Sequence, residues 1–265
     1  MKCFSINLVV LIGVVTFSNA QAQQPVVISQ QLEQKVIEWR RHLHQHPELS
    51  NREFNTAKVI AEHLNGLGLE VQTGIAHTGV VGVLIGGKPG PTIALRADMD
   101  ALPVIEQTDI PFKSIAKSEY RSNEVGVMHA CGHDLHMAML MGAAERLSSM
   151  KNDIAGTIVF IFQPAEEGAP KGEEGGAELM LKEGLFSQHQ PDVVFGIHVW
   201  SAGNTGHIGY REGPLMASSD RFEIIVKGRQ THGSRPWGGV DPIVAAGQII
   251  GSTQTIVSRQ VNITK

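Results

Sequence analysis

The chain has 265 residues, of which 42% are hydrophobic and 18% charged, as is usual for a soluble globular protein of one large or two small domains. Its formal net charge of −4 excludes the strongly basic surface that binds nucleic acids or anionic membranes. We therefore expect no nucleic acid and no membrane surface among the partners of the mature protein.

The first 22 residues have the features of an export signal. Lys2 supplies a positive start, residues 6–17 form an apolar run, and small residues follow up to Ala22. The run is short for a membrane-spanning helix, although an uncleaved N-terminal anchor is the alternative interpretation. We predict cleavage after Ala20 or Ala22 and a protein that is exported, either periplasmic or secreted.

Removal of this signal would leave Cys131 as the only cysteine, because Cys3 lies within the signal. Cysteines of exported proteins usually pair, and a single one cannot form an internal disulfide. Cys131 is therefore a buried small side chain, a reactive thiol or a metal ligand. Its histidine neighbours in "HACGHD" favour the metal ligand.

The first part of the mature chain predicts two helices. Leu32, Val36, Trp39 and Leu43 recur at spacings of four, three and four residues, which places them on one helix face, and Pro47 ends this helix. The segment "FNTAKVIAEHLNGLG" repeats the pattern and is closed by glycines.

Short β-branched runs bounded by Gly, Pro or Asp then follow. They are apolar nearly throughout, as expected of strands that are buried on both faces. Helical segments at 135–150 and 175–186 alternate with them, so we predict an α/β fold with a mostly parallel sheet and flanking helices. The predicted strands are 80–87, 92–98, 156–164 and 192–200.

From about residue 213 the pattern changes. A half-exposed strand is predicted at 220–228, and an amphipathic helix at 240–259 with Pro242 in its first turn. One strand and one helix cannot bury a core. The predicted division is a signal peptide over 1–22, a main domain over 23–212 and the beginning of a second domain over 213–265.

Acidic residues and metal-ligand types gather at the ends of the predicted strands and in the loop before the helix at 135–150. Singly, such residues are most often turn residues, helix caps or packed histidines. Sites in open α/β sheets form beyond the carboxyl ends of the strands, so these residues are expected to meet in one cleft. They are Asp98, Asp100, Cys131, His133, Asp134, Glu166, Glu167 and His198.

A thiolate, imidazoles and a carboxylate together suit zinc, manganese or cobalt rather than calcium or magnesium. One residue of the pair Glu166 and Glu167 can bind metal, while the other takes a proton from a water acidified by the ions and passes it to a leaving amine. Asp100 would orient a ligating histidine from behind. The alternative chemistry is a thiol nucleophile, with Cys131 paired to His129 or His133.

Six stretches, in this order, carry a resemblance to a known family: "RRHLHQHPELS", "ALRADMDALP", "MHACGHDLHMAML", "FQPAEEG", "GIHVW" and "THGSRPWGGVDPI". The chain resembles the amidohydrolase branch of the co-catalytic two-metal peptidases. That branch includes hippurate hydrolase, N-acyl-amino-acid amidohydrolases, some carboxypeptidases and plant auxin-conjugate hydrolases. The resemblance implies a zinc-peptidase-like catalytic domain and the beginning of an inserted α+β lid and dimerisation domain.

The resemblance also implies roles for individual residues. The implied ligands of two divalent ions are Cys131, which bridges both ions, His133, Glu167 and His198. Glu166 matches the general base, Asp100 the carboxylate behind the metal site, and His232 the lid-domain residue that stabilises an oxyanion across a dimer. Asp98 stands where other branches carry a ligating histidine, and we do not include it. Manganese or zinc is expected, with cobalt or nickel as alternatives.

The implied activity is that of a metal-dependent amidohydrolase that cleaves the amide bond of N-acyl amino acids or small peptides. The resemblance further implies a homodimer formed through the lid domain. Because family members are longer and deliver a final histidine ligand after the inserted domain, we expect a C-terminally truncated form. The alternative hypothesis is therefore a catalytically inactive fragment that only binds metal or ligand.

Overall fold

The computed structural model describes residues 28–217 and 222–261. The predicted export signal, which includes Cys3, lies outside the described residues. The chain divides into two units, one ending at Gly203 and one beginning at Asn204, and each is described by itself. Within the described ranges, no helix has both the length and the apolar character needed to cross a bilayer.

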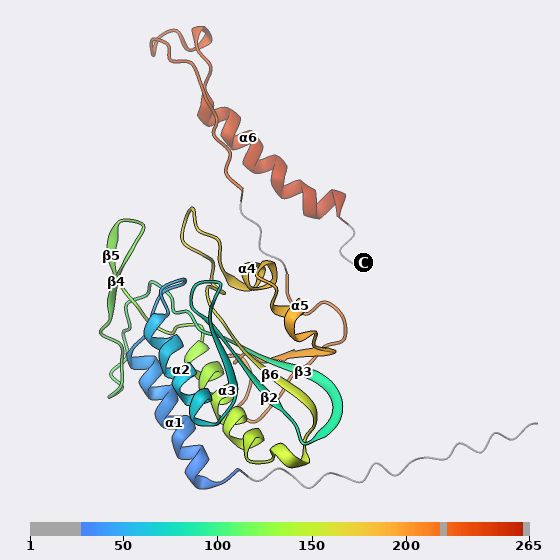
Figure 1. The fold of residues 1–265 in the computed structure, drawn as a ribbon. Coiled ribbons are helices and arrows are strands. Elements are labelled where there is room, and N and C mark those ends of the chain that lie inside the picture. The colour runs from blue at the N-terminus through green and yellow to red at the C-terminus, as the bar shows by residue number, and fades with distance from the viewer. Residues whose placement is uncertain (1–27, 218–221, 262–265) are drawn as a thin grey trace, which may run out of the picture. The chain divides into compact units, whose positions relative to one another are not determined.

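The first unit is built on a five-stranded sheet with the order β1-β2-β6-β3-β7. Its strands are β1 (Glu70–Ile75), β2 (Gly79–Ile85), β3 (Lys88–Asp98), β6 (Ala155–Gln163) and β7 (Val193–Gly196). The pairs β6–β3 and β3–β7 are parallel, whereas β1–β2 and β2–β6 are antiparallel. The predicted α/β fold with flanking helices is confirmed, but the sheet is mixed because β1 and β2 form a hairpin against β6 (Figure 1).

Five α-helices lie in the described part of this unit, and their ends follow local sequence signals. They are α1 (Gln30–Gln45), α2 (Phe54–Gly66), α3 (His133–Ser148), α4 (Gly176–Lys182) and α5 (Leu185–His189). Ser29 begins α1, where its hydroxyl oxygen accepts the N–H of Leu32 at 3.2 Å. The single helix predicted at 175–186 is in fact two short helices, because Gly184 adopts the left-handed conformation between them.

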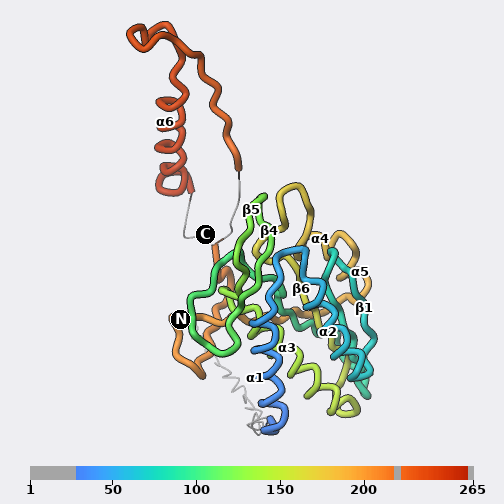
Figure 2. The backbone as a smooth tube through the Cα atoms, turned by 90° about the vertical axis from the view of Figure 1, so that its left-hand side faces the viewer, coloured from blue at the N-terminus to red at the C-terminus, as the bar shows by residue number. Residues whose placement is uncertain are grey.

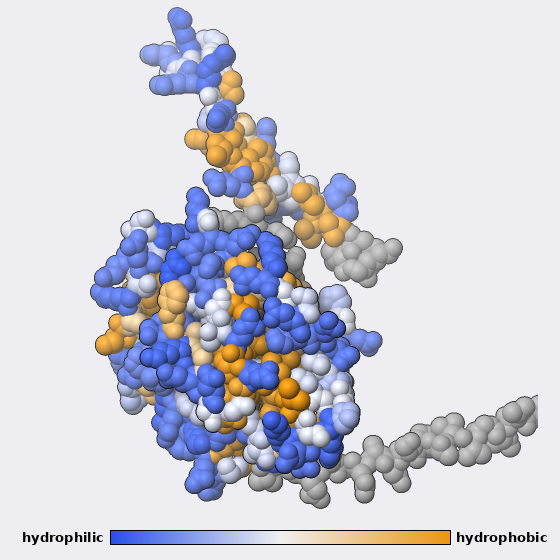
Figure 3. Space-filling view, viewed as in Figure 1, coloured by the Kyte–Doolittle hydropathy of each residue, from blue (hydrophilic) through white to orange (hydrophobic). Residues whose placement is uncertain are grey.

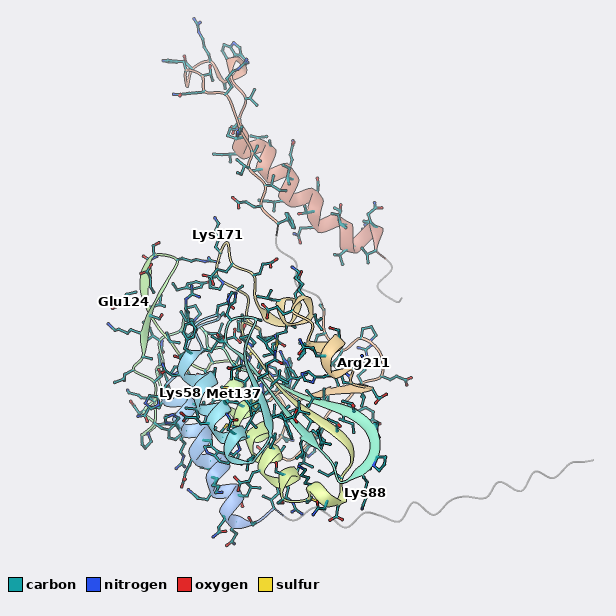
Figure 4. The ribbon with its side chains drawn as sticks, in the orientation of Figure 1. Lys58, Lys88, Glu124, Met137, Lys171 and Arg211 are labelled. Atoms are coloured by element: carbon teal, nitrogen blue, oxygen red, sulfur yellow. The ribbon has the colours of Figure 1, made fainter. Side chains whose placement is uncertain are left out.

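Alternate residues of the central strands pack on opposite faces of the sheet. On one face, Phe160 and Phe162 of β6 belong to a core cluster with Leu43 of α1, Ile60 of α2 and Met137 of α3. These three helices lie side by side along that face (Figure 2), and the label on Met137 marks the buried middle of this layer in Figure 4. The larger core of the unit is therefore on this side.

The opposite face of the sheet carries a smaller core. Val159 and Ile161 of β6 pack there with Met180 of α4 and Leu185 of α5. The alternation along β6 explains why its sequence is apolar throughout, since both faces are covered.

Strand β7 differs from the prediction that every strand is buried on both faces. Val193, Val194 and Phe195 are between 40% and 56% exposed. Among the described residues, β7 pairs only with β3. The prediction was wrong for this strand because an apolar run indicates strand formation but not whether the strand lies at an edge.

A small hairpin stands apart from the main sheet. Its strands are β4 (Lys117–Tyr120) and β5 (Asn123–Gly126), which pair in antiparallel fashion. It lies in the long connection between β3 and α3, and the sequence did not reveal it because both strands are polar and short.

The second unit contains the helix α6 (Pro242–Thr255), followed by a π-helical turn (Ile256–Gln260). Pro242 lies in the first turn as predicted, and Asp241 caps the helix by accepting the N–H of Ile243 at 2.8 Å. The strand predicted at 220–228 is wrong for residues 222–228, which have no pairing strand among the described residues. Apolar side chains of α6 are exposed (Figure 3), and the domain boundary at 213 stays a prediction.

Candidate metal centre

The carboxyl ends of β6, β3 and β7 point the same way and supply most of the candidate site. Asp100 lies two residues beyond β3, and Glu166 and Glu167 follow β6. His198 follows β7, and Cys131 with His133 comes from the beginning of α3. The structure therefore brings together the predicted site residues of the first unit, with one correction: Asp134 faces away from them and pairs with His44 and Arg40, each at 2.9 Å. His232 lies in the second unit, where its Nδ1 accepts from the hydroxyl of Ser234.

His133 presents a buried ring nitrogen that has no hydrogen-bond partner among the described residues. Its Nδ1–H donates to the backbone carbonyl of Asp100 at 2.8 Å, which leaves Nε2 as the unprotonated nitrogen. That Nε2 lies 3.7 Å from Glu166 Oε2 and 3.8 Å from Glu167 Oε1. A cation would stabilise this arrangement of a ring nitrogen and carboxylate oxygens. It can be a proton, which the raised pKa of His133 favours, or a metal ion, which these ligand types also fit.

His198 is held in the same tautomer as His133. Its Nδ1–H donates to the backbone carbonyl of Val199 at 2.6 Å, and its Nε2 lies 3.4 Å from Cys131 Sγ. Metal-ligating histidines typically donate their second ring N–H to a carbonyl or carboxylate in this way. Two imidazole Nε2 atoms and a thiol are thus oriented as a set of metal ligands would be.

The chemistry of Cys131 argues against the thiol-nucleophile alternative. Burial, the hydrogen bond to Glu167 and the charges of nearby carboxylates raise the pKa of Cys131 to about 12. A nucleophilic cysteine instead needs a lowered pKa and a partner base. His129 cannot serve as that base, because burial lowers its pKa to about 4 and neither ring nitrogen contacts a partner in the described structure. A divalent ion would reverse the effect and hold the thiolate.

Asp100 contacts the site through both its side chain and its backbone. Its carboxylate oxygens accept the backbone N–H of Glu166 at 3.0 Å and that of Glu167 at 2.9 Å. The hydroxyl of Ser50 also donates to this carboxylate, at 2.7 Å. Asp100 thus holds His133 mainly through its backbone carbonyl, while its side chain fixes the turn that carries both glutamates.

Sequence reasoning missed Glu53, which supports the same turn from the other side. Its fully buried carboxylate accepts the backbone N–H of Ala165 at 2.9 Å and the hydroxyl of Thr78 at 2.6 Å. Ala165 has a φ of 48°, in the left-handed region, and immediately precedes Glu166. A glutamate just before a helix looks like an ordinary capping residue, so no sequence signal identifies this role.

A second missed residue is His136, on the same side of α3 as His133. Its Nδ1–H donates to Asp98 Oδ1 at 2.6 Å, and its Nε2 accepts the N–H of Val199 at 2.9 Å. The other Asp98 oxygen accepts from Arg96 at 2.7 Å. Because both ring nitrogens of His136 are engaged, His136 has no free ligand atom. The spacing of three residues from His133 on a helix was the available signal.

A cavity of about 570 Å³ adjoins the glutamate turn. It is lined by Glu166 together with Arg96, Gln163 and Lys182, and by residues of the loop that Lys171 marks in Figure 4. Its volume suits a small-molecule ligand. Glu166 is 39% exposed, so its carboxylate reaches this cavity.

Residues 94–263 match Peptidase family M20/M25/M40. The chain belongs to this family. It is 48% identical over 233 residues to thermostable carboxypeptidase 1 of Saccharolobus solfataricus, covering 88% of this chain and 56% of that protein. It is 45% identical over 227 residues to an N-acyl-L-amino acid amidohydrolase of Geobacillus stearothermophilus, covering 86% of this chain and 58% of that protein. The chain therefore spans somewhat more than half the length of these curated relatives.

A solved structure of the M20 family shows the same fold. It is the YXEP protein of Bacillus subtilis, described as a dinuclear metal-binding peptidase, with 40% identity and a TM-score of 0.62. The match covers 71% of this chain and 48% of that one. The M20 family assignment and this dinuclear relative support a site for two divalent metals at the strand ends described above.

Proposed function

We propose that this M20 chain carries the main part of the active site of a metal-dependent amidohydrolase that cleaves N-acyl amino acids or small peptides. The observation that carries the proposal is the shared orientation of His133 and His198. Each donates its Nδ1–H to a backbone carbonyl and directs Nε2 toward a thiol or carboxylates. The relatives named amidohydrolase and carboxypeptidase support the same reaction class.

In this proposal four side chains hold two divalent ions, manganese or zinc, with cobalt or nickel as alternatives. The ligands are Cys131, His133, Glu167 and His198. Cys131 would belong to this ligand set, because its Sγ lies 3.4 Å from His198 Nε2 and one residue separates it from His133. When bound, the ions supply Lewis acidity, which lowers the pKa of a water molecule and polarises an amide carbonyl.

Glu166 is the proposed general base. Burial raises the pKa of Glu166 in the metal-free chain, His133 opposes this, and nearby Asp98 and Glu167 add to it. Its carboxylate is partly exposed beside the cavity and lies next to the proposed ligands, as a base that takes a proton from water must. Glu166 accepts the proton of the attacking water and later donates it to the leaving amine. Asp100 keeps Glu166 and Glu167 in place through their backbone N–H groups.

The proposed substrate class rests on the relatives named amidohydrolase and carboxypeptidase and on the small, polar cavity beside Glu166, whose lining includes Arg96, Lys182 and four glutamates. The volume of this cavity suits a small amide substrate. We further propose that His232 stabilises the oxyanion from a lid domain across a homodimer, and that the protein acts after export. Both proposals rest on the sequence resemblance.

Two measurements on the purified chain test the proposal. Bound metal is quantified by mass spectrometry, and the release of amino acid is assayed from hippurate and from a series of acetyl-amino acids. We expect bound manganese or zinc and turnover of at least one substrate. Glu166→Gln should retain metal and lower kcat by about 10²–10⁴-fold.

The matched control is Glu62→Gln, which makes the same chemical change at an exposed position of α2 and should leave kcat unchanged. Metal binding without turnover of any substrate would instead support a chain that only binds metal. A chain that binds no divalent ion would contradict the proposal entirely.

A further inference from the structure

We infer that His136 is a positioning residue that fixes His198 for metal binding through the backbone of Val199. The inference rests on the proposed function, in which His198 is a metal ligand. His136 has no role in the sequence-based predictions or in the proposed mechanism.

The backbone of Val199 joins the two histidines. Its N–H donates to His136 Nε2 at 2.9 Å, and its carbonyl accepts the Nδ1–H of His198 at 2.6 Å. The Nε2 of His198 then lies 3.4 Å from Cys131 Sγ. The buried His136 thus holds the backbone N–H of Val199, and the carbonyl of Val199 orients His198.

The tautomer of His136 follows from these contacts. Because its Nε2 accepts the N–H of Val199, its proton is on Nδ1, which donates to Asp98 at 2.6 Å. Asp98 is in turn fixed by Arg96 at 2.7 Å. His136 is only 2% exposed and lies within the first turn of α3, so it offers Val199 a rigid acceptor.

The His198 segment needs such a fixed point, because the strand that leads into it gives little support. Strand β7 ends at Gly196 and its apolar side chains are exposed. Within the described part of the chain, the side chain of His198 forms hydrogen bonds only with Val199 and Cys131. The N–H of Val199 is therefore the link between this exposed segment and the buried helix.

Packing supports the same link. A Cβ atom on Gly132 would lie 2.3 Å from Val199 Cγ2, so the valine side chain sits directly against the backbone between Cys131 and His133. This close approach and the bond to His136 together place the His198 segment against the beginning of α3.

His136 could be read instead as a ligand, since its ring lies within ligand distance of Asp98 and His133. Its two hydrogen bonds decide against this, because both ring nitrogens are engaged. His133 differs in having a free Nε2.

Two substitutions of His136 test its two hydrogen bonds separately. Glutamine can place an amide oxygen near the position of Nε2 and accept the N–H of Val199, whereas asparagine can only replace the Nδ1 donor to Asp98. We expect His136→Asn to weaken Co²⁺ affinity by about 10–100-fold and to reduce the thiolate-to-cobalt absorption band. His136→Gln should retain most of both signals.

A double-mutant cycle with His198→Ala tests whether the effect passes through His198. If His136 acts by positioning, His136→Asn should cause little further loss of Co²⁺ affinity in the His198→Ala background. The matched control is His63→Asn, because His63 also bonds to α3, at the carbonyl of Met141, but has no link to the ligands. It should leave the cobalt spectrum unchanged.

A wild-type measurement keeps the inference testable even where a variant does not fold. Nitrogen-15 NMR of the imidazoles should show His136 with its proton on Nδ1. A proton on Nε2, additive losses in the cycle, or unchanged Co²⁺ affinity in folded His136→Asn would each overturn the inference. Failure of the wild type itself to bind Co²⁺ would instead count against the proposed function.

Discussion

The carboxylate of Asp100 accepts the backbone N–H of Glu167 at 2.9 Å, while its other oxygen accepts that of Glu166. The two glutamates are therefore held mainly through their backbone, and the Glu167 side chain also contacts Cys131. This leaves one carboxylate free to bind a metal and the other free to move a proton.

We expect Asp100→Asn to impair both functions. An amide nitrogen would face one of the two backbone N–H groups, so that group loses its acceptor. Metal affinity should fall by about 10–100-fold, measured by competition with a chelator, and turnover should fall with it. The control is Asp109→Asn, at a fully exposed aspartate, and an equal loss there would show that the effect is not specific.

Glu53 offers a test of how the turn is supported. Burial raises the pKa of Glu53, although the bonds from Thr78 and Ala165 oppose this. When the pKa of a carboxyl group is higher in the folded state, the protein becomes less stable as the pH rises above the pKa of that group in the unfolded state. The neutral variant Glu53→Gln can still accept the N–H of Ala165, so we expect it to be at least as stable as the wild type at pH 7.

Glu53→Ala should behave differently, because two buried donors lose their acceptor. We expect a loss of about 2–4 kcal/mol in the free energy of unfolding, measured with urea at pH 7. Equal losses in the glutamine and alanine variants would show that the hydrogen bonds of Glu53 do not matter.

Gly132→Ala should disturb the site from the middle of the "CGH" motif. Gly132 has a φ of 95°, and an added Cβ would lie 2.3 Å from Val199 Cγ2. We expect the free energy of unfolding, measured by thermal denaturation, to fall by about 2–3 kcal/mol, and Co²⁺ binding to weaken. Gly66→Ala is the control, since no atom lies within 4 Å of its added Cβ, and it should be neutral or stabilising.

The buried pair of His44 and Asp134 predicts a pH-dependent stability. The hydrogen bonds that His44 donates to Asp134, at 2.9 Å, and to Glu106 raise the pKa of His44 above its ordinary value of 6.5, although burial opposes this. The stabilisation is therefore complete below about pH 6.5 and is lost as pH rises through the folded-state pKa. His44→Gln should cost about 1.5–3 kcal/mol at pH 5.5 and less at pH 9.

Urea unfolding at the two pH values measures this difference. His42→Gln, on the same helix but exposed, is the control and should show no larger loss at low pH. A loss from His44→Gln that does not change with pH would mean that the charge of His44 contributes nothing.

Much of the site could be predicted because parallel strands deliver their carboxyl ends to one edge. The apolar runs that end near Asp98 and Gln163 marked β3 and β6, and the ligand types that follow them meet as expected. The same signal failed for β1, whose polar and mostly exposed sequence carries no apolar run.

The roles of His136 and Glu53 could not be predicted from the sequence for a different reason. His136 bonds to Asp98 38 residues away, and Glu53 bonds to Ala165 112 residues away. A buried polar side chain takes its role from whichever partner the fold brings to it, and a single sequence does not encode that partner locally. The exposure of β7 is likewise set by its place in the sheet order.

That exposure has a consequence for handling the protein. Within the described residues β7 pairs on one side only and presents Val193, Val194 and Phe195 to solvent. An open apolar edge of this kind recruits strands from other molecules, so aggregation during expression should limit the soluble yield. The substitution Phe195→Lys would place a charge on this edge, which disfavours pairing with other strands, and should raise the soluble yield.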